Sequence, residues 1–527
     1  MRRVPVVSPP WNLPVRVLLL PLLVASTLGA QARPATSPAT PATAASPARP
    51  AANDTVDRVV QTTHVARIGG AEVRYTATVG RLTLRTAAGK PRAHMFFTYY
   101  RKDGEDVKAR PITFTYNGGP GSPSIWLHMG VMGPKRVQMG TDGFQPAPPY
   151  TLVDNEDSPL DVTDIVMIDP VQTGFSRAAD GEDMRPFLGV RGDVQSVAEF
   201  IRLFTARFNR WPSPKYLLGE SYGTMRSAGL SAELQNRHGM ELNGIILVSS
   251  ILDYQSKGYV PGNDYPYANF LPSFTASAWY HKKLPADLQA MGLEKAVAES
   301  RTFAFGEYLS ALVKGTRLQG SERSAIIGKV ARYSGLSPEF IAQANVRVSD
   351  QRFRKELLRD RGLHIGRLDG RYTGVDADAA GESQEYDPSN QALGGPYTAL
   401  FLDYVRRDLG WEMELPYFTS GQVQPWDYAP YSNRYLNMVE DLRSAMARNP
   451  FLKVLVANGY YDFATPFAAT EYTFDHLGME PSYRERVSLK YYEGGHMMYI
   501  HPTLLKQLKR DIAAFIQATR RGAAANN

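Results

Sequence analysis

The sequence predicts an α/β protein with a mostly parallel central sheet. Short apolar runs bounded by turn residues, Ile165–Ile168 and Gly244–Val248, are typical of parallel strands that are buried on both faces. Patterns of helical period lie between such runs, for example over 191–208 and 223–237. This alternation of strands and helices predicts the α/β class.

We expect the sheet to begin with antiparallel strands. Three strand-like runs, over 71–79, 81–85 and 93–100, are separated by Gly80 and by Gly89-Lys90-Pro91, which favour turns. Short turns join antiparallel neighbours, whereas parallel neighbours need a longer crossover. The chain is therefore predicted to start with an antiparallel part that becomes parallel later.

The first 53 residues have the features of an export signal and a tether. Arginines precede an apolar run over 17–25, and Ala30-Gln31-Ala32 resembles a cleavage site, so residues 1–32 are predicted to be a signal peptide. An uncleaved anchor is the alternative, although the run is short for a membrane span. Residues 33–53 repeat Pro, Ala, Ser and Thr, which predicts a disordered linker. These features predict a secreted or periplasmic protein.

A candidate nucleophile lies in the sequence Gly-Glu-Ser-Tyr-Gly at 219–223. The strand-like run Lys215–Leu218 precedes it, and a helical pattern rich in Ala, Leu and Met follows. A strand, a sharp turn flanked by glycines and a helix lift a serine hydroxyl clear of the backbone. Ser221 is therefore the predicted nucleophile.

An aspartate and a histidine follow two later strand-like runs. Asp462 comes after the run at 454–457, and His496 comes after the run at 487–492. Sites in open α/β sheets assemble at the carboxyl ends of the strands. The chain order Ser, Asp, His is that of the α/β-hydrolase fold. In this interpretation His496 is the general base, and Asp462 holds its tautomer and stabilises the imidazolium.

A glycine-rich loop follows the strand-like run Ile112–Tyr116. It reads Asn-Gly-Gly-Pro-Gly-Ser over 117–122. Backbone N–H groups of such a loop, together with the N–H of the residue after the nucleophile, here Tyr222, form the usual oxyanion hole. A phosphate loop is excluded because no Gly-Lys-Ser/Thr is present.

Residues 256–415 interrupt the rhythm of strands and helices. An aromatic, Pro-rich stretch over Tyr259–Tyr280 comes first, and helix-like patterns follow. These patterns cover 285–314, 321–334, 338–344 and 351–361. We interpret the insertion as a mainly helical cap over the site, with a second independent domain as the alternative. The hydrolase core is then divided between 54–255 and 416–520, and 521–527 is a disordered tail.

The motifs together resemble the serine carboxypeptidase family, which includes the vacuolar and lysosomal carboxypeptidases. The matching segments are Asn-Gly-Gly-Pro-Gly-Ser at 117–122, Gly133-Pro134, Gly174-Phe175-Ser176, Gly-Glu-Ser-Tyr at 219–222, Asn458-Gly459 with Asp462, and Gly-Gly-His-Met at 494–497. The resemblance runs in order from about residue 70 to residue 515. Glu220, directly before the serine, is its most specific mark.

The resemblance implies an α/β-hydrolase that removes single residues from peptide C-termini. It implies that Ser221, Asp462 and His496 form the triad and that the N–H groups of Gly119 and Tyr222 form the oxyanion hole. It places three residues near the terminal carboxylate of the substrate: Asn117, Gly118 and Glu220. The chain departs from the family in having no cysteine, and in Val131, which stands where a second Glu is common. Without that second acid, we expect a less acidic pH optimum than is usual for the family.

Composition excludes several other functions. The net charge is +7, and +4 remains when Arg2, Arg3 and Arg16 of the leader are removed, which is too small to indicate nucleic acid as a partner. No segment after the leader is long and apolar enough to span a membrane. The segment Asp376–Gly381 lacks the ligands of a calcium loop and is expected to be a solvated acidic loop. We therefore predict no metal, no cofactor and a peptide substrate, and the sequence does not indicate the oligomeric state.

Two further interpretations stay open at this stage. The first keeps the fold and changes the bond: an aminopeptidase of the prolyl iminopeptidase kind, an esterase, or an acyltransferase. The second is a peptide-binding protein without catalysis. Glu220 favours a carboxypeptidase over the first, and the presence of all three triad residues disfavours the second. Peptides blocked at one end or the other discriminate the bonds, and a fluorophosphonate label discriminates an enzyme from a binder.

Overall fold

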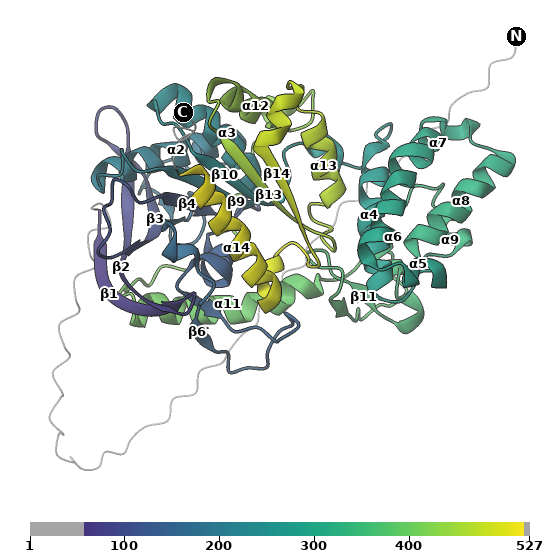
Figure 1. The fold of residues 1–527 in the computed structure, drawn as a ribbon, viewed down its shortest axis with the longest axis horizontal. Coiled ribbons are helices and arrows are strands. Elements are labelled where there is room, and N and C mark those ends of the chain that lie inside the picture. Colours follow the sequence, from purple (N-terminus) through teal and green to yellow (C-terminus); the bar gives the residue numbers. More distant parts are fainter. Residues whose placement is uncertain (1–56, 521–527) are drawn as a thin grey trace, which may run out of the picture. The chain divides into compact units, whose positions relative to one another are not determined.

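The computed structural model describes residues 57–520, and over that range the central sheet has ten strands (Figure 1). Nine of them form a continuous path: β1 (Val59–Ile68), β2 (Ala71–Arg85), β3 (Pro91–Lys102), β7 (Asp164–Ile168), β4 (Ile112–Tyr116), β9 (Lys215–Ser221), β10 (Gly244–Ser250), β13 (Lys453–Gly459) and β14 (Val487–Tyr492). The tenth, β8 (Arg177–Ala178), pairs with β3. The predicted signal peptide, linker and tail lie outside the described residues.

The direction of pairing changes along the sheet. The strands β1, β2, β3 and β7 pair antiparallel, and every pair from β7 to β14 is parallel. The prediction of a mostly parallel sheet with an antiparallel N-terminal part is confirmed. Two pairs of short strands lie outside the sheet: β5 (Lys135–Val137) with β6 (Leu152–Asp154), and β11 (His364–Ile365) with β12 (Thr373–Gly374).

The N-terminal strands differ in detail from the prediction. The turn expected at Gly80 is absent, because β2 runs unbroken through it. In addition, β1 precedes the first expected strand and pairs with β2 along its whole length. A Cβ at Gly80 would lie 2.7 Å from the carbonyl oxygen of Arg58 and 2.9 Å from the side chain of Val59. The glycine therefore permits close approach of a neighbouring strand and does not form a turn.

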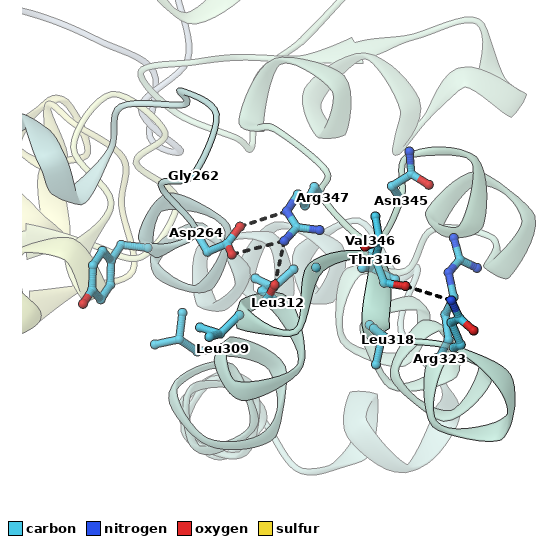
Figure 2. A pocket seen from close by; sticks show the side chains of 14 residues that line it. Gly262, Asp264, Leu309, Leu312, Thr316, Leu318, Arg323, Asn345, Val346 and Arg347 are labelled. Carbon is cyan, nitrogen blue, oxygen red and sulfur yellow. Dashed lines mark hydrogen bonds and ion pairs between the residues drawn. The ribbon is translucent and has the colours of Figure 1, made fainter.

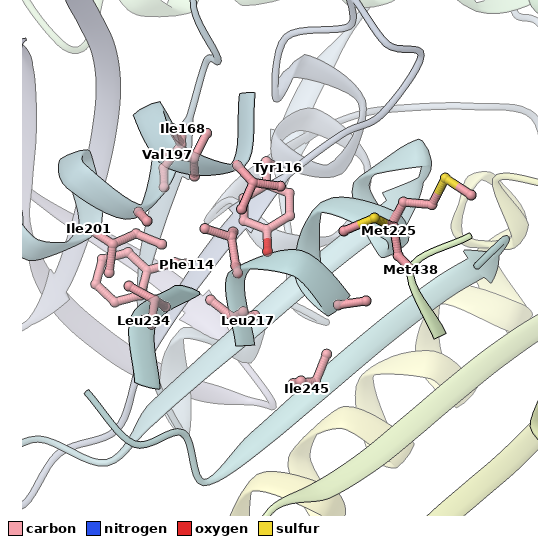
Figure 3. Close-up of a cluster of buried hydrophobic side chains, with 14 of the residues drawn as sticks. Phe114, Tyr116, Ile168, Val197, Ile201, Leu217, Met225, Leu234, Ile245 and Met438 are labelled. Carbon is pink, nitrogen blue, oxygen red and sulfur yellow. The ribbon is translucent and has the colours of Figure 1, made fainter. Parts of the chain in front are cut away.

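Helices cover both faces of the sheet, and the side chains of each strand alternate between them. On one face, Ile245 and Leu247 pack in a cluster with α2 (Val190–Arg207), α3 (Tyr222–His238) and α12 (Val439–Arg448) (Figure 3). On the other face, Ile246 and Val248 pack in a cluster with α11 (Pro388–Arg407) and α14 (Pro502–Thr519). The short helix α1 (Ile125–Leu127) belongs to the second cluster, and α13 (Phe467–Asp475) follows β13. Parallel strands buried on both faces read as continuous apolar runs for this reason.

The insertion between β10 and β13 begins with a group of helices that has its own hydrophobic core (Figure 1). These helices are α4 (Tyr265–Tyr280), α5 (Ala286–Ala290), α6 (Leu293–Phe303), α7 (Leu309–Val313), α8 (Gly320–Ser334), α9 (Pro338–Gln343) and α10 (Asp350–Glu356). The sequence analysis missed α4, which contains Pro272 and is buried along most of its length. Tertiary packing therefore overrides the low helix propensity of this segment.

The last helix of the insertion packs elsewhere. Leu393, Tyr397 and Phe401 of α11 belong to the cluster on the sheet, whereas the helices from α4 to α10 surround a separate core. Asp387 caps α11 by accepting a hydrogen bond from the N–H of Ser389. The segment that was interpreted as a cap therefore has two parts, one of which covers the sheet. Over residues 57–520, no helix has the length and apolarity needed to cross a bilayer.

Candidate active site

Ser221 occupies a sharp turn between a strand and a helix. It is the last residue of β9, and α3 begins at the next residue. Its backbone has φ 59° and ψ −129°, a positive φ that is strained for a residue with a side chain. A Cβ on Gly219 would lie 2.2 Å from the carbonyl oxygen of Gly223. Strand and helix can approach this closely only where that side chain is missing, which is the geometry expected of a nucleophile turn.

His496 and Asp462 form a buried hydrogen-bonded pair. The Nδ1 of His496 lies 2.7 Å from the Oδ2 of Asp462. Asp462 also accepts hydrogen bonds from the N–H groups of Ala464 and Thr465, at 2.7 and 2.9 Å, and from the hydroxyl of Thr465 at 2.6 Å. These contacts fix the carboxylate, which in turn leaves the Nε2 of His496 for the substrate side.

The two members of this pair shift each other's pKa in opposite directions. Burial raises the pKa of Asp462, but the charge of His496 and the hydrogen bonds of Asp462 outweigh it and hold the pKa below its usual value. Burial lowers the pKa of His496, but the charges of Asp462 and Glu220 outweigh it and raise the pKa above its usual value. The arrangement therefore stabilises an imidazolium beside an ionised carboxylate, which is what a general base needs after it has taken a proton.

Ser221 and His496 line the same cavity. Its volume is about 300 Å³, and Glu220 and the loop Asn117–Gly119 also line it. The candidate nucleophile, the candidate base and the glycine-rich loop therefore meet in one place, although β9, β14 and β4 supply them from distant parts of the chain. The structure brings the predicted site residues together around this cavity, with Asp462 behind His496.

A larger hollow of about 1000 Å³ lies in the cap (Figure 2). Its residues come from the start of α4 and from the segments around α7, α8 and α9. Asp264 and Arg347, which line it, bind each other through two hydrogen bonds of 2.8 and 3.1 Å. It contains no serine, histidine or buried acid. We therefore place the candidate active site in the smaller cavity, because chemistry and not volume identifies a site.

The glycine-rich loop touches the nucleophile turn. A Cβ on Gly118 would lie 2.4 Å from the backbone nitrogen of Tyr222. Gly119 has φ +105°, a conformation that residues with side chains rarely adopt. The N–H of Ser122 donates to the carbonyl of Gly118 at 3.0 Å and closes the loop. Glycine at 118 and 119 therefore allows the loop to lie against the turn that carries Ser221.

Glu220 is buried beside Ser221 and has two hydrogen-bond partners. Its Oε1 accepts from the side-chain amide of Asn117 at 2.9 Å, and its Oε2 accepts from the hydroxyl of Tyr499 at 2.6 Å. Burial raises the pKa of Glu220 to about 7, although the charge of His496 and both hydrogen bonds oppose the rise. The carboxyl is therefore largely neutral at acidic pH.

Two residues near Glu220, namely Asp462 and Tyr499, change what the sequence analysis expected of its surroundings. Val131, at the position where a second acid is common, is fully buried. The like charge that raises the pKa of Glu220 comes instead from Asp462. Tyr499 was not predicted, because only the fold brings it from beyond His496 to Glu220. Nothing in a tyrosine three residues after a histidine indicates such a contact.

The acidic segment at 376–381 differs from the prediction. Asp376 is buried and lies 2.5 Å from the Nζ of Lys355. It also accepts a hydrogen bond from the N–H of Glu385. The expectation of a solvated loop is therefore wrong for Asp376, because an ion pair compensates the burial of its charge.

Comparison with known proteins identifies the family. A profile described as serine carboxypeptidase matches residues 80–502. The chain belongs to the serine carboxypeptidase family. It is 28% identical over 166 residues to serine carboxypeptidase-like 29 of Arabidopsis thaliana, and this alignment spans 30% of the chain and 30% of the plant protein.

The solved structures that match the chain share little sequence with it. A proline iminopeptidase of Mycobacterium smegmatis has a TM-score of 0.36 and 12% identity, with 84% of this chain and 98% of that chain covered. An α/β hydrolase from a Medee basin deep-sea metagenome library has a TM-score of 0.32 and 10% identity, with 82% and 97% covered.

A buried ion pair supports the glycine-rich loop through the carbonyl of Asn117. Arg226, on α3, is 1% exposed, and its Nε donates to the Oδ2 of Asp193 at 2.8 Å. Its Nη1 donates to the carbonyl of Asn117 at 2.6 Å. Tyr222 also donates its hydroxyl to Asp193, at 3.1 Å. Because a peptide's C=O and the following N–H point in opposite directions, holding the Asn117 carbonyl also orients the N–H of Gly118.

The sequence analysis did not assign a role to either member of this pair. The only available signal was Arg226 in the apolar helix that follows the nucleophile, where a charged residue must have a partner if it is buried. The position of Asp193 in α2 gave no indication of the pairing.

We predict that Arg226→Met slows the labelling of Ser221 by a fluorophosphonate by roughly tenfold or more, because the oxyanion loop loses its support. The matched control is Arg210→Met. Arg210 is also fully buried, and it pairs with Asp164 outside the cavity. Arg226→Met leaves the buried carboxylate of Asp193 without a cationic partner and should lose about 3–5 kcal/mol of stability. In Arg210→Met, Asp164 keeps its buried ion pair with Arg110, so this variant should lose less stability.

The comparison is made per folded molecule, with the folded fraction measured by thermal unfolding. Arg210→Met should keep the labelling rate of the parent. Equal loss of labelling in both variants would mean that Arg226 acts only on stability.

Proposed function

We propose that the protein is a secreted or periplasmic serine carboxypeptidase that releases C-terminal residues from peptides through an acyl-enzyme. The observation that carries the proposal is the buried Glu220 next to Ser221. A neutral carboxyl can donate a hydrogen bond to the terminal carboxylate of a peptide, whereas an ionised one repels it. Asn117 and the N–H of Gly118 supply further donors at the same place.

Acylation begins with proton transfer. The Oγ of Ser221 gives its proton to the Nε2 of His496 and forms a bond to the carbonyl carbon of the last peptide bond. The N–H groups of Gly119 and Tyr222 stabilise the oxyanion that develops. The C–N bond then breaks as His496 returns the proton to the leaving amine, and the C-terminal amino acid departs.

Deacylation repeats these steps with water. His496 takes a proton from water, and the oxygen attacks the carbonyl carbon of the ester. The C–O bond to Ser221 breaks, and the oxygen of the serine regains a proton from His496. Asp462 remains ionised throughout, because its pKa is held low, and it keeps the imidazole in the productive orientation.

The specificity experiment compares three forms of one peptide: N-terminally blocked with a free carboxylate, blocked at both ends, and free at the N-terminus with a C-terminal amide. We expect cleavage of the first only, with release of the last residue. Ser221→Ala should lower kcat by about four to six orders of magnitude. Equal cleavage of free-acid and amide peptides would refute the carboxypeptidase assignment, and removal of N-terminal residues would indicate an aminopeptidase.

The role of Glu220 predicts a pH dependence. Since its pKa is about 7, the carboxyl is protonated and can donate below that pH, and kcat/KM on free-acid peptides should fall as the pH rises through this value. Glu220→Gln should remove this alkaline limb, because an amide donates at every pH. On the acidic limb Glu220 is already protonated and carries no charge, so this limb, which reports the titration of His496, should change little in Glu220→Gln.

Both limbs are measured as kcat/KM against pH for the parent and for Glu220→Gln. The blocked ester of the same peptide, which has no terminal carboxylate, is the control substrate and should lack the Glu220-dependent limb. An alkaline limb that is unchanged in Glu220→Gln would rule out the role assigned to Glu220.

Export rests on the leader sequence, which lies outside the described residues. Cleavage after Ala32 predicts a mature chain that begins at or near Arg33. N-terminal sequencing of the protein from culture medium or periplasm measures this. Recovery of the intact leader in the membrane fraction would indicate an anchor instead.

A further inference from the structure

One permanent positive charge lines the catalytic cavity. Among the described residues, the ionisable side chains that line it are Glu220, His496 and Arg367. The first two must both be uncharged in the proposed working state, whereas a guanidinium stays charged at every pH that a protein tolerates. The remaining lining is uncharged and includes the polar residues Asn390, Thr419 and Ser420.

The main chain at Arg367 is fixed against both catalytic loops. Its carbonyl accepts a hydrogen bond of 3.0 Å from the N–H of Phe463, the residue that follows the catalytic aspartate. The next carbonyl, that of Leu368, accepts from the N–H of His496 at 2.6 Å. The Cα of Arg367 is therefore positioned by the catalytic residues themselves, so its side chain begins at a fixed point of the cavity wall.

The guanidinium has no hydrogen-bond or ion-pair partner within residues 57–520. Asp387 is hydrogen-bonded to the main chain at Arg367, and its carboxylate oxygens also accept from Leu368 and Ser389. Its Oδ1 accepts from the N–H of Arg367 at 3.0 Å, and its Oδ2 accepts from the N–H of Leu368 at 3.3 Å. The hydroxyl and the N–H of Ser389 also donate to Oδ1. Arg367 therefore remains exposed to the cavity with its charge unpaired.

A second cation adds to the positive potential. The Nζ of Lys257 donates to the carbonyl of Ala464 at 2.6 Å, and Ala464 lines the cavity. Burial, followed by the charge of Arg367, lowers the pKa of Lys257 to about 8. The charge of Arg367 also opposes the rise in the pKa of His496. The field of Arg367 thus reaches the residues around the reacting bond.

We propose that Arg367 binds a side-chain carboxylate of the substrate, so that the enzyme prefers peptides with Asp or Glu at one of the two residues that flank the scissile bond. The inference rests on the proposed carboxypeptidase function and specifies its substrate class. A planar guanidinium binds a carboxylate through two parallel hydrogen bonds.

Arg367 reaches the cavity from a different part of the chain than the groups proposed to bind the peptide terminus. Glu220 and Asn117 belong to β9 and to the loop after β4, whereas Arg367 belongs to the insertion and follows β11. A terminal carboxylate is recognised by a neutral acid and an amide in the proposed mechanism. The charged arginine is thus available for the side chain.

The experiment measures kcat/KM on N-blocked free-acid peptides in two series, one that varies the last residue and one that varies the residue before it. Each series compares Asp with Asn and Glu with Gln, which differ in charge and hardly in shape. We expect about a tenfold preference for the acid in one series, between the values typical of exposed and of buried charged pairs. The series that shows the preference identifies the residue that Arg367 binds.

Three variants separate this role from a general effect on the protein. In Arg367→Gln the ratio of acidic to neutral peptide should fall to about one, and in Arg367→Glu the preference should shift to Lys-containing peptides. The matched control is Arg361→Gln, which removes an exposed arginine of the same insertion outside the cavity and should keep the ratio of the parent. The ratio is a readout that a loss of stability would not change.

Two results would overturn the proposal. One is equal kcat/KM for acidic and neutral peptides in the parent. The other is a uniform loss on all free-acid peptides in Arg367→Gln, which would assign Arg367 to the terminal carboxylate. Failure of the proposed function gives a different result, namely no trimming of any free-acid peptide, neutral ones included. In that case the binding of a carboxylate is tested by itself, through protection of Ser221 from the fluorophosphonate label. Asp-containing peptides should protect Ser221 better than Asn-containing peptides in the parent, and equally well in Arg367→Gln.

Discussion

The site depends on the close approach of two backbone segments, the loop after β4 and the turn after β9. A Cβ on Gly118 would lie 2.4 Å from the backbone nitrogen of Tyr222, and a Cβ on Gly219 would lie 2.2 Å from the carbonyl of Gly223. Side chains at these positions would separate the segments. The same approach brings the side-chain amide of Asn117 within hydrogen-bond distance of Glu220, and it brings the loop next to the turn that carries Ser221. A steric constraint therefore underlies both the proposed oxyanion site and the burial of Glu220.

Burial beside Ser221 has an electrostatic consequence. Glu220 and His496 lie in one low-dielectric environment, and each affects the pKa of the other: the charge of His496 lowers that of Glu220, and the charge of Glu220 raises that of His496. The proposed mechanism needs the shared proton on Glu220 and a neutral His496. Their titrations are therefore coupled, so the pH profile belongs to the pair. Tyr499 and Asn117, which both donate to Glu220, bias this balance toward ionised Glu220.

The insertion contributes to the site through its main chain as well as its side chains. The backbone at 367–368 accepts hydrogen bonds from Phe463 and His496, and Phe463 also packs in the core of the cap. The loop that carries Asp462 and the loop that carries His496 are thus each hydrogen-bonded to the insertion. Replacement of the insertion would change the cavity wall, and it would also remove hydrogen bonds that hold the Asp462–His496 pair. Substrate preference and catalytic geometry therefore depend on the same segment.

The sequence predicted the sheet, most of its strands and the order of the catalytic motifs, because these depend on local patterns. Buried parallel strands are apolar throughout, and glycines must flank the strained Ser221. Local patterns misjudged Gly80, which allows the close approach of a neighbouring strand. They also missed α4, whose aromatic side chains pack in the core of the cap.

The sequence by itself determined which residues could carry the chemistry and in which order they occur. Only the tertiary structure decided which distant groups surround them: Tyr499 on Glu220, the Arg226–Asp193 pair behind Asn117, and Arg367 in the cavity wall. The physical reason is that a strand, a turn or a helix is specified by neighbours in the chain, whereas a hydrogen bond between segments hundreds of residues apart exists only once the core has packed.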